Sequence, residues 1–169
     1  GDIFLGVTVP TLRIIVKNYY KEISLREIQK LLNSKIHEYR LTALLILVEK
    51  YKEDKELIYN IYVKNFRNIN NWNLVDLTAP KIMGDFLKDK NRDILYSLAT
   101  SNNLWEKRIS IVATFAFIKD NDFKDTLKIS EILLKNGHDL IHKAVGWMLR
   151  EVGKRNKDLE KEFLDKNYA

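Results

Sequence analysis

The sequence has no cysteine, only two prolines and only six glycines among its 169 residues. The absence of cysteine is compatible with a reduced, cytoplasmic setting and removes the thiolate ligands of many zinc sites. The longest purely apolar run, Ala43 to Val48, is far too short to span a bilayer, and no signal peptide is visible. A glycine-rich phosphate loop and a nucleophile elbow are also missing, so we expect no cofactor. Because the apolar runs are short, we also expect no membrane partner.

Apolar residues are nonetheless plentiful, because 46% of the chain is hydrophobic, which argues against disorder. We predict one domain over residues 1–169, a monomer that acts in the cytoplasm. Lys and Arg number 29 against 23 Asp and Glu, which gives a formal charge of +6. This excess favours a polyanionic partner such as DNA, although a soluble protein from a lysine-rich proteome would show it too.

Apolar residues recur with the spacing of one helix face along most of the chain. Ser24 and Glu27 have the spacing of a capping box that opens such a helix. The segment 41–48 is apolar nearly all round, so its helix should lie between two layers of other helices. Clear examples of the one-face pattern are Leu12, Ile15, Val16 and Tyr19, then Ile94, Leu95 and Leu98, and later Ile141, Ala144, Val145 and Met148.

Four short segments that each open a long apolar helix recur at nearly constant spacing. Their last residues, Arg40, Val75, Arg108 and Lys143, lie 33 to 35 residues apart. That is the length of one helical hairpin per repeat. We therefore predict an all-α fold, a right-handed helical solenoid of antiparallel helix pairs with HEAT-like repeats of about 33–35 residues. The connections are short and polar, and Gly137 is able to take the left-handed conformation that ends a helix.

Equivalent helices of a solenoid stack side by side, so residues far apart in sequence should meet on one concave wall. We expect Arg40, Arg108 and the segments Trp72–Asp76 and Lys143–Trp147 on that wall.

Trp72 and Asp76 are four residues apart and share a helix face. A carboxylate beside an aromatic ring suits a site that handles positive charge. The alternative is a packed indole beside a carboxylate that caps a helix or pairs with an arginine. Pro80 should disturb the backbone just beyond Asp76, leaving a kink or a new first turn.

Lys143, Trp147, Arg150 and Lys154 form one basic stripe along the last long helix. An indole among cations indicates contact with a phosphate backbone or with a sugar and base, whereas the alternative is a solvated charged face. These three cations and Arg40 are our candidate DNA contacts. Arg108 suits a bidentate phosphate contact, or else a salt bridge within the fold.

A histidine pair, His138 and His142, has metal-ligand spacing in the same region, but no third ligand is apparent. We therefore expect no metal.

Four stretches carry a family resemblance: FLGVTVP (residues 4–10), NWNLVDLTAPKI (71–82), NLWEKR (103–108) and HDLIHKAVGWMLREVG (138–153). Together they closely resemble the bacterial DNA alkylation repair glycosylases of the AlkD type. The resemblance runs through almost the whole chain. It implies a HEAT-like solenoid that excises cationic alkylpurines, such as 3-methyladenine and 7-methylguanine, from duplex DNA.

The resemblance also assigns roles. It implies that Asp76 is the catalytic carboxylate, that Trp72 and Trp147 contact the sugar and the lesion, and that Arg108 contacts DNA. It further implies that the lesion is not flipped into a deep pocket. Because similar proteins extend beyond both ends of this sequence, we expect the chain to be truncated at both termini.

Two other functions are compatible with the sequence. One is a non-catalytic DNA-binding solenoid that recognises distorted or branched duplexes, and the other is a protein-interaction scaffold. Release of an alkylated base separates the first interpretation from both alternatives.

Overall fold

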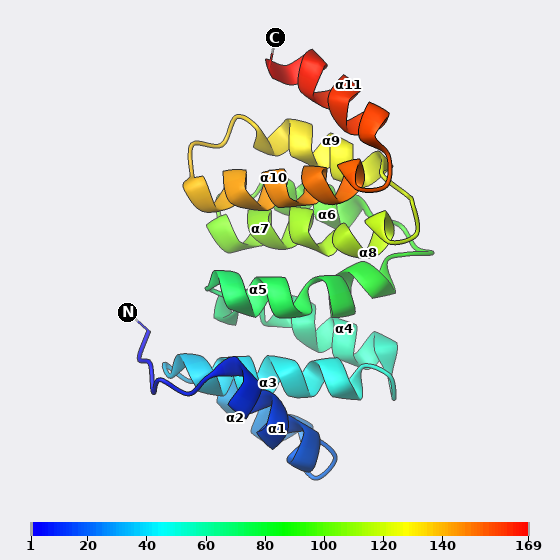
Figure 1. The fold of residues 1–169 in the computed structure, drawn as a ribbon. Coiled ribbons are helices and arrows are strands. Elements are labelled where there is room, and N and C mark those ends of the chain that lie inside the picture. The colour runs from blue at the N-terminus through cyan, green and yellow to red at the C-terminus, as the bar shows by residue number, and fades with distance from the viewer. Residues whose placement is uncertain (1, 169) are drawn as a thin grey trace. The chain divides into compact units, whose positions relative to one another are not determined.

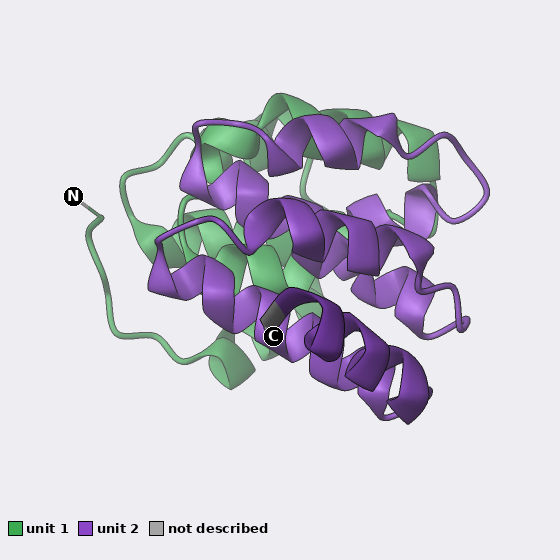
Figure 2. Ribbon diagram, turned by 90° about the horizontal axis from the view of Figure 1, so that it is seen from above, with its two compact units in different colours: residues 1–78 green, residues 79–169 purple. Residues whose placement is uncertain are grey.

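The computed structural model describes residues 2–168, which are helical except for their connections and one isolated β-bridge (Figure 1). The predicted all-α class is confirmed, and the helical hairpins are compatible with a repeat solenoid. The chain divides into two compact units, residues 1–78 and 79–169 (Figure 2). The prediction of a single domain over 1–169 is not tested by this division.

Unit 1 is built around one buried helix. Its elements are α1 (Val9–Tyr19), α2 (Leu25–Leu32), α3 (His37–Lys50), α4 (Lys55–Lys64), the short 3-10 helix η1 (Phe66–Asn68) and α5 (Trp72–Thr78). Helix α3 packs against α1, α2, α4 and α5. Because neighbours surround it, Leu44 and Ile46, which lie on opposite faces of the helix, are both buried. The prediction that segment 41–48 lies between layers is therefore confirmed.

The N-terminal residues 2–6 form a strap held against the start of α3. The Ile3 amide donates to the Lys35 carbonyl, and the His37 amide donates to the Ile3 carbonyl. The Glu38 carboxylate accepts hydrogen bonds of 2.9 Å from the amides of Leu5 and Gly6. Burial raises the pKa of Glu38, but these backbone hydrogen bonds outweigh it and lower the pKa overall.

Unit 2 repeats the helical-hairpin theme. It contains the π-helical turn η2 (Pro80–Gly84), α6 (Asp93–Ala99), α7 (Leu104–Ala113), α8 (Phe115–Ile118), α9 (Lys124–Leu133), α10 (Asp139–Gly153) and α11 (Lys157–Tyr168). Helix α7 packs against α6, α9 and α10, and α11 packs against α10. No helix among residues 2–168 combines the length and apolar content needed to cross a membrane.

The prediction for Pro80 is confirmed. Helix α5 ends at Thr78, and the chain continues as a π-helical turn in which the Gly84 amide donates to the Ala79 carbonyl. Gly84 has no room for a side chain, since an added Cβ would lie 2.2 Å from the Ala113 carbonyl oxygen.

Local sequence signals had mixed outcomes. Ser24 and Glu27 form the predicted capping box at the start of α2. Gly137, which is able to take the left-handed conformation, does not adopt it, because within the described residues Gly6 and Asn121 alone have positive φ. Asn121 takes the left-handed position instead, in the turn before α9, where its short polar side chain tolerates φ of 59°.

Candidate functional site

Helix α5 presents an indole and a carboxylate on one side and buries the other. The Val75 amide donates to the Asn71 carbonyl, which sets Trp72 in the first turn. Trp72 is 53% exposed and Asp76, one turn further on, is partly exposed. Leu74 and Val75, which lie between them in sequence, are fully buried. The acid therefore stands at the edge of the core with an accessible ring face beside it.

The charge of Asp76 also acts on a buried tyrosine, Tyr62. The Tyr62 hydroxyl lies 3.0 Å from the Thr78 hydroxyl, and both residues are fully buried. Burial raises the pKa of Tyr62; the hydrogen bond with Thr78 opposes this change, and the Asp76 charge adds to it. Tyr62 consequently remains a neutral hydrogen-bonding group next to the acid.

Asn73 fixes the first turn of α5 to the start of α3. Its amide nitrogen lies 3.1 Å from Nε2 of His37, a residue that is only 3% exposed. The Nδ1 atom of His37 lies 3.7 Å from an Asp2 carboxylate oxygen. Asn73, which follows Trp72 on α5, is therefore held against a buried residue of α3 in unit 1.

Arg40 is not on an open surface, which differs from its predicted place on a DNA-binding wall. It is 3% exposed, and its guanidinium pairs with Asp2 at 2.6 Å and donates to the Ser34 carbonyl and the Asn70 side chain. The N-terminal strap supplies the acid that satisfies this buried charge. Arg40 thus fastens residues 2–6 and 70 to α3, and a role in contacting DNA has no support from its geometry.

Arg108 is similarly enclosed within unit 2. It lies on α7, is 5% exposed and donates a hydrogen bond to the Leu140 carbonyl in the first turn of α10. Its guanidinium therefore links the start of α10 to α7, whether or not it also meets DNA.

Trp147 on α10 is half-buried. Its ring lies 5.7 Å from the ring of Phe115, whose other neighbour is the Lys119 ammonium at 4.8 Å. The indole also hydrogen-bonds to the Glu151 carboxylate, one turn along the same helix. Lys154 pairs with Glu151 at 2.6 Å, and this hydrogen bond is the main reason that the pKa of Glu151 is lowered.

Glu151 went unnoticed in the sequence, although Trp147 and Glu151 have the same spacing as Trp72 and Asp76. That spacing was the available signal. Glu151 is 8% exposed and is enclosed by Trp147 and Lys154, with Arg155 at 3.9 Å. An identical pattern thus produces a carboxylate that is already neutralised.

The remaining members of the basic stripe are the cations of α10. Lys143 and Arg150 are exposed, as is Lys154. Lys143 pairs with Asp139 at 2.7 Å, an exposed contact of small energetic weight that a phosphate can replace. The stripe is therefore accessible, and its contact with DNA stays a prediction.

The two histidines of the predicted pair have different roles. Nδ1 of His138 accepts the Leu140 amide and so caps α10. Among residues 2–168 no three metal-binding side chains gather together.

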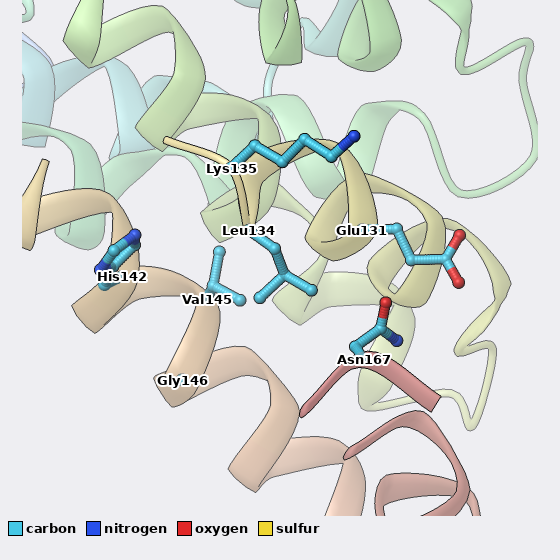
Figure 3. Close-up of a pocket in the computed structure, with 7 residues that line it drawn as sticks. All are labelled: Glu131, Leu134, Lys135, His142, Val145, Gly146 and Asn167. Carbon is cyan, nitrogen blue, oxygen red and sulfur yellow. The ribbon is translucent and has the colours of Figure 1, made fainter. Parts of the chain in front are cut away.

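His142 instead lines a cavity of about 450 Å³ between α9, α10 and α11, with the apolar side chains of Leu134 and Val145 on its floor (Figure 3). Neither Trp147 nor Arg108 lines this hollow.

The structure brings together Trp72 with Asp76 on α5, and Trp147 with the basic stripe on α10. The first pair belongs to unit 1, and the second group to unit 2. The expectation that all of them share one wall stays a prediction.

Comparison with protein families agrees with the resemblance carried by these motifs. The model of the family described as DNA alkylation repair enzyme matches residues 1–169. The chain belongs to the DNA alkylation repair enzyme family. A repair enzyme of this family acts on DNA, a partner compatible with the excess of basic residues. No individual curated protein matches the chain.

Proposed function

We propose that this DNA alkylation repair enzyme is a monofunctional DNA glycosylase that removes positively charged N-alkylated purines, such as 3-methyladenine and 7-methylguanine, from duplex DNA. The observation that carries the proposal is the exposed indole of Trp72 beside the partly exposed carboxylate of Asp76 on one face of α5. Membership of the repair family supports a DNA substrate.

The chemistry follows from the charge of the lesion. An N-alkylated purine already carries positive charge, so it can leave with the electrons of the N-glycosidic bond without being protonated. Positive charge then develops on the sugar. A fixed carboxylate near the anomeric carbon stabilises that charge, and water adds to the carbon and loses its proton. Asp76 supplies the carboxylate in this scheme.

The indole of Trp72 has a separate task. Its exposed ring face offers negative electrostatic potential to a cationic base or to the sugar as its positive charge grows. In the proposal Trp147 makes a comparable ring contact, and Lys143, Arg150 and Lys154 bind phosphates. Arg108 is assigned to support of α10, because its guanidinium is buried against the Leu140 carbonyl.

The decisive experiment measures release of 7-methylguanine from methylated duplex DNA under single-turnover conditions. We expect Asp76→Asn to lower the rate constant by about 100-fold or more, the scale seen when one group that stabilises transition-state charge is removed. Asp158→Asn, an exposed acid on α11, is the matched control and should retain the wild-type rate. Equal rates for Asp76→Asn and the control would remove Asp76 from the mechanism.

A DNA-binding protein without catalysis is the second candidate, and the exposed cations of α10 are the observation that favours it. It predicts that Lys143→Ala and Arg150→Ala weaken binding and reduce its salt dependence, while neither wild type nor variant releases a base. Measuring binding and base release on the same duplex separates the two functions.

A further inference from the structure

A second hollow in unit 2 lies where the first turns of α6 and α9 pack together. It has a volume of about 450 Å³ and is lined by four cationic and two acidic side chains, together with Tyr96. The cations are Lys90, Arg92, Lys124 and Lys128, and the acids are Asp93 and Asp125. None of these residues belongs to the proposed glycosylase site.

The floor of this hollow is a closed hydrogen-bond network. Arg92 bonds to Asp122 and Asp125 at 2.6 Å each and to the carbonyls of Leu87 and Lys88. Its guanidinium also lies 3.8 Å from the centre of the Phe117 ring. All three nitrogens of the Arg92 guanidinium donate to groups of the protein. This arginine is therefore a fixed structural support of the hollow, and it is not assigned to ligand binding.

Tyr96 completes the floor. Its hydroxyl donates to the second carboxylate oxygen of Asp125. Burial and this hydrogen bond raise the pKa of Tyr96, so the hydroxyl stays protonated and keeps Asp125 satisfied. Asp125 is thereby held by both Arg92 and Tyr96. Because Arg92 also pairs with Asp122, one guanidinium faces two carboxylates, and the floor keeps one net negative charge beneath the lysines.

The mouth of the hollow differs from the floor. Lys90, Lys124 and Lys128 line it. Within residues 2–168 none of them contacts a carboxylate at ion-pair distance, although the Lys124 charge acts on Asp125 and Lys90 lies over the Phe86 ring at 4.8 Å. Elsewhere in unit 2 paired lysines are common, since Lys88, Lys143, Lys154 and Lys166 contact carboxylates at 2.6–2.8 Å. The acid at the mouth, Asp93, is engaged by the side chain of Asn91.

We propose that this hollow binds a phosphate group through Lys90, Lys124 and Lys128. Three ammonium groups gathered around a rigid floor repel one another, and a bound dianion relieves that repulsion while accepting hydrogen bonds from each. Phosphate could come from a DNA segment outside the reacting site or from a small phosphorylated compound. Both sources share this recognition chemistry. The site goes beyond the proposed glycosylase function and does not depend on it.

The test titrates the whole chain with inorganic phosphate and follows the backbone amide signals of α9 by NMR. Wild type should show saturable shifts at Lys124 and Lys128. Lys124→Ala with Lys128→Ala should weaken binding by about tenfold, the scale expected when two exposed charge contacts are removed. Lys157→Ala with Lys161→Ala removes the same charge from exposed positions of α11 and should bind like wild type.

A parallel titration with unmodified duplex DNA identifies the source. If DNA supplies the phosphate, the pocket variant should lower the salt slope of duplex binding by roughly 0.9 for each phosphate that it no longer neutralises, relative to the α11 control. If a small compound supplies it, both variants should share one slope while only the pocket variant binds inorganic phosphate more weakly. Absence of shifts in wild type, or equal weakening in both variants, would overturn the proposal. Base release by Asp76 is measured separately, so either function can fail alone.

Discussion

Helices α5 and α10 each carry a tryptophan followed four residues later by an acid, yet the two pairs have different environments. On α5, Trp72 is 53% exposed and Asp76 borders the surface. On α10, Trp147 packs on Phe115 and hydrogen-bonds to Glu151, which Lys154 neutralises. The difference teaches that spacing places two side chains on one face, whereas their neighbours decide how far each side chain is buried.

The largest expected effect separates the two acids by activity. Asp76→Asn should reduce base release by about 100-fold or more, whereas Glu151→Gln should leave the rate within about threefold of wild type. Glu151→Gln should instead lower the free energy of unfolding by about 1 kcal/mol, because it removes a charged hydrogen bond to Lys154. Single-turnover rates and urea unfolding of both variants provide the measurements. A large rate decrease in Glu151→Gln alone would reverse the assignment.

A glycine near each Trp–acid pair, Gly84 after α5 and Gly146 on α10, allows the space around the two backbones to be compared by substitution with alanine. Gly84→Ala, in the turn after α5, should lower the free energy of unfolding by about 3 kcal/mol, because the new Cβ would meet the Ala113 carbonyl and the Ala116 side chain. Gly146→Ala, next to Trp147, should raise it by about 1 kcal/mol, because nothing lies within 4 Å of the new Cβ. Thermal unfolding with calorimetry measures both changes, and a destabilised Gly146→Ala would contradict the open environment.

The indoles should differ in what they contribute to stability. Trp147→Ala should cost about 2 kcal/mol, since it removes the packing against Phe115 and the hydrogen bond to Glu151. Trp72→Ala should stay within about 0.5 kcal/mol of wild type, because Trp72 is 53% exposed and loses less packing. Urea unfolding tests the contrast. If both variants are destabilised equally, Trp72 is a packing residue and the open-site interpretation of α5 fails.

The smallest effect concerns pH. The hydrogen bond from Lys154 is the main cause that lowers the pKa of Glu151, with burial opposing it. A folded-state pKa below the unfolded value adds stability at pH above the unfolded value, near 4.3, and this stability disappears as pH falls through the folded value. The stability difference between wild type and Glu151→Gln should therefore shrink below about pH 4. A difference that stays constant as the solution is acidified through this range would exclude the linkage.

Apolar periodicity predicted the all-α class because every helix must bury one face, and that requirement is written into the spacing of its own residues. The same holds for the Ser24 capping box and the disturbance at Pro80, since both depend on near neighbours in sequence. Arg40 and Glu151 illustrate the limit. Arg40 is paired with Asp2, 38 residues away, so its sequence neighbours do not show that its charge is already neutralised. Glu151 is paired with Lys154 on the next turn, but the sequence does not show whether such a nearby lysine contacts the acid or stays in solvent.

The strap of residues 2–6 has a consequence for design. Glu38 binds it through the amides of Leu5 and Gly6, so the main chain is anchored while the side chains of Ile3 and Leu5 are exposed and Phe4 packs against the His37 ring at 4.8 Å. These hydrogen bonds to the main chain do not depend on which side chains the strap carries. Positions 3 and 5 can therefore be diversified, as on a display scaffold, to tune how unit 1 meets other molecules, whereas Phe4 is kept for its contact with His37.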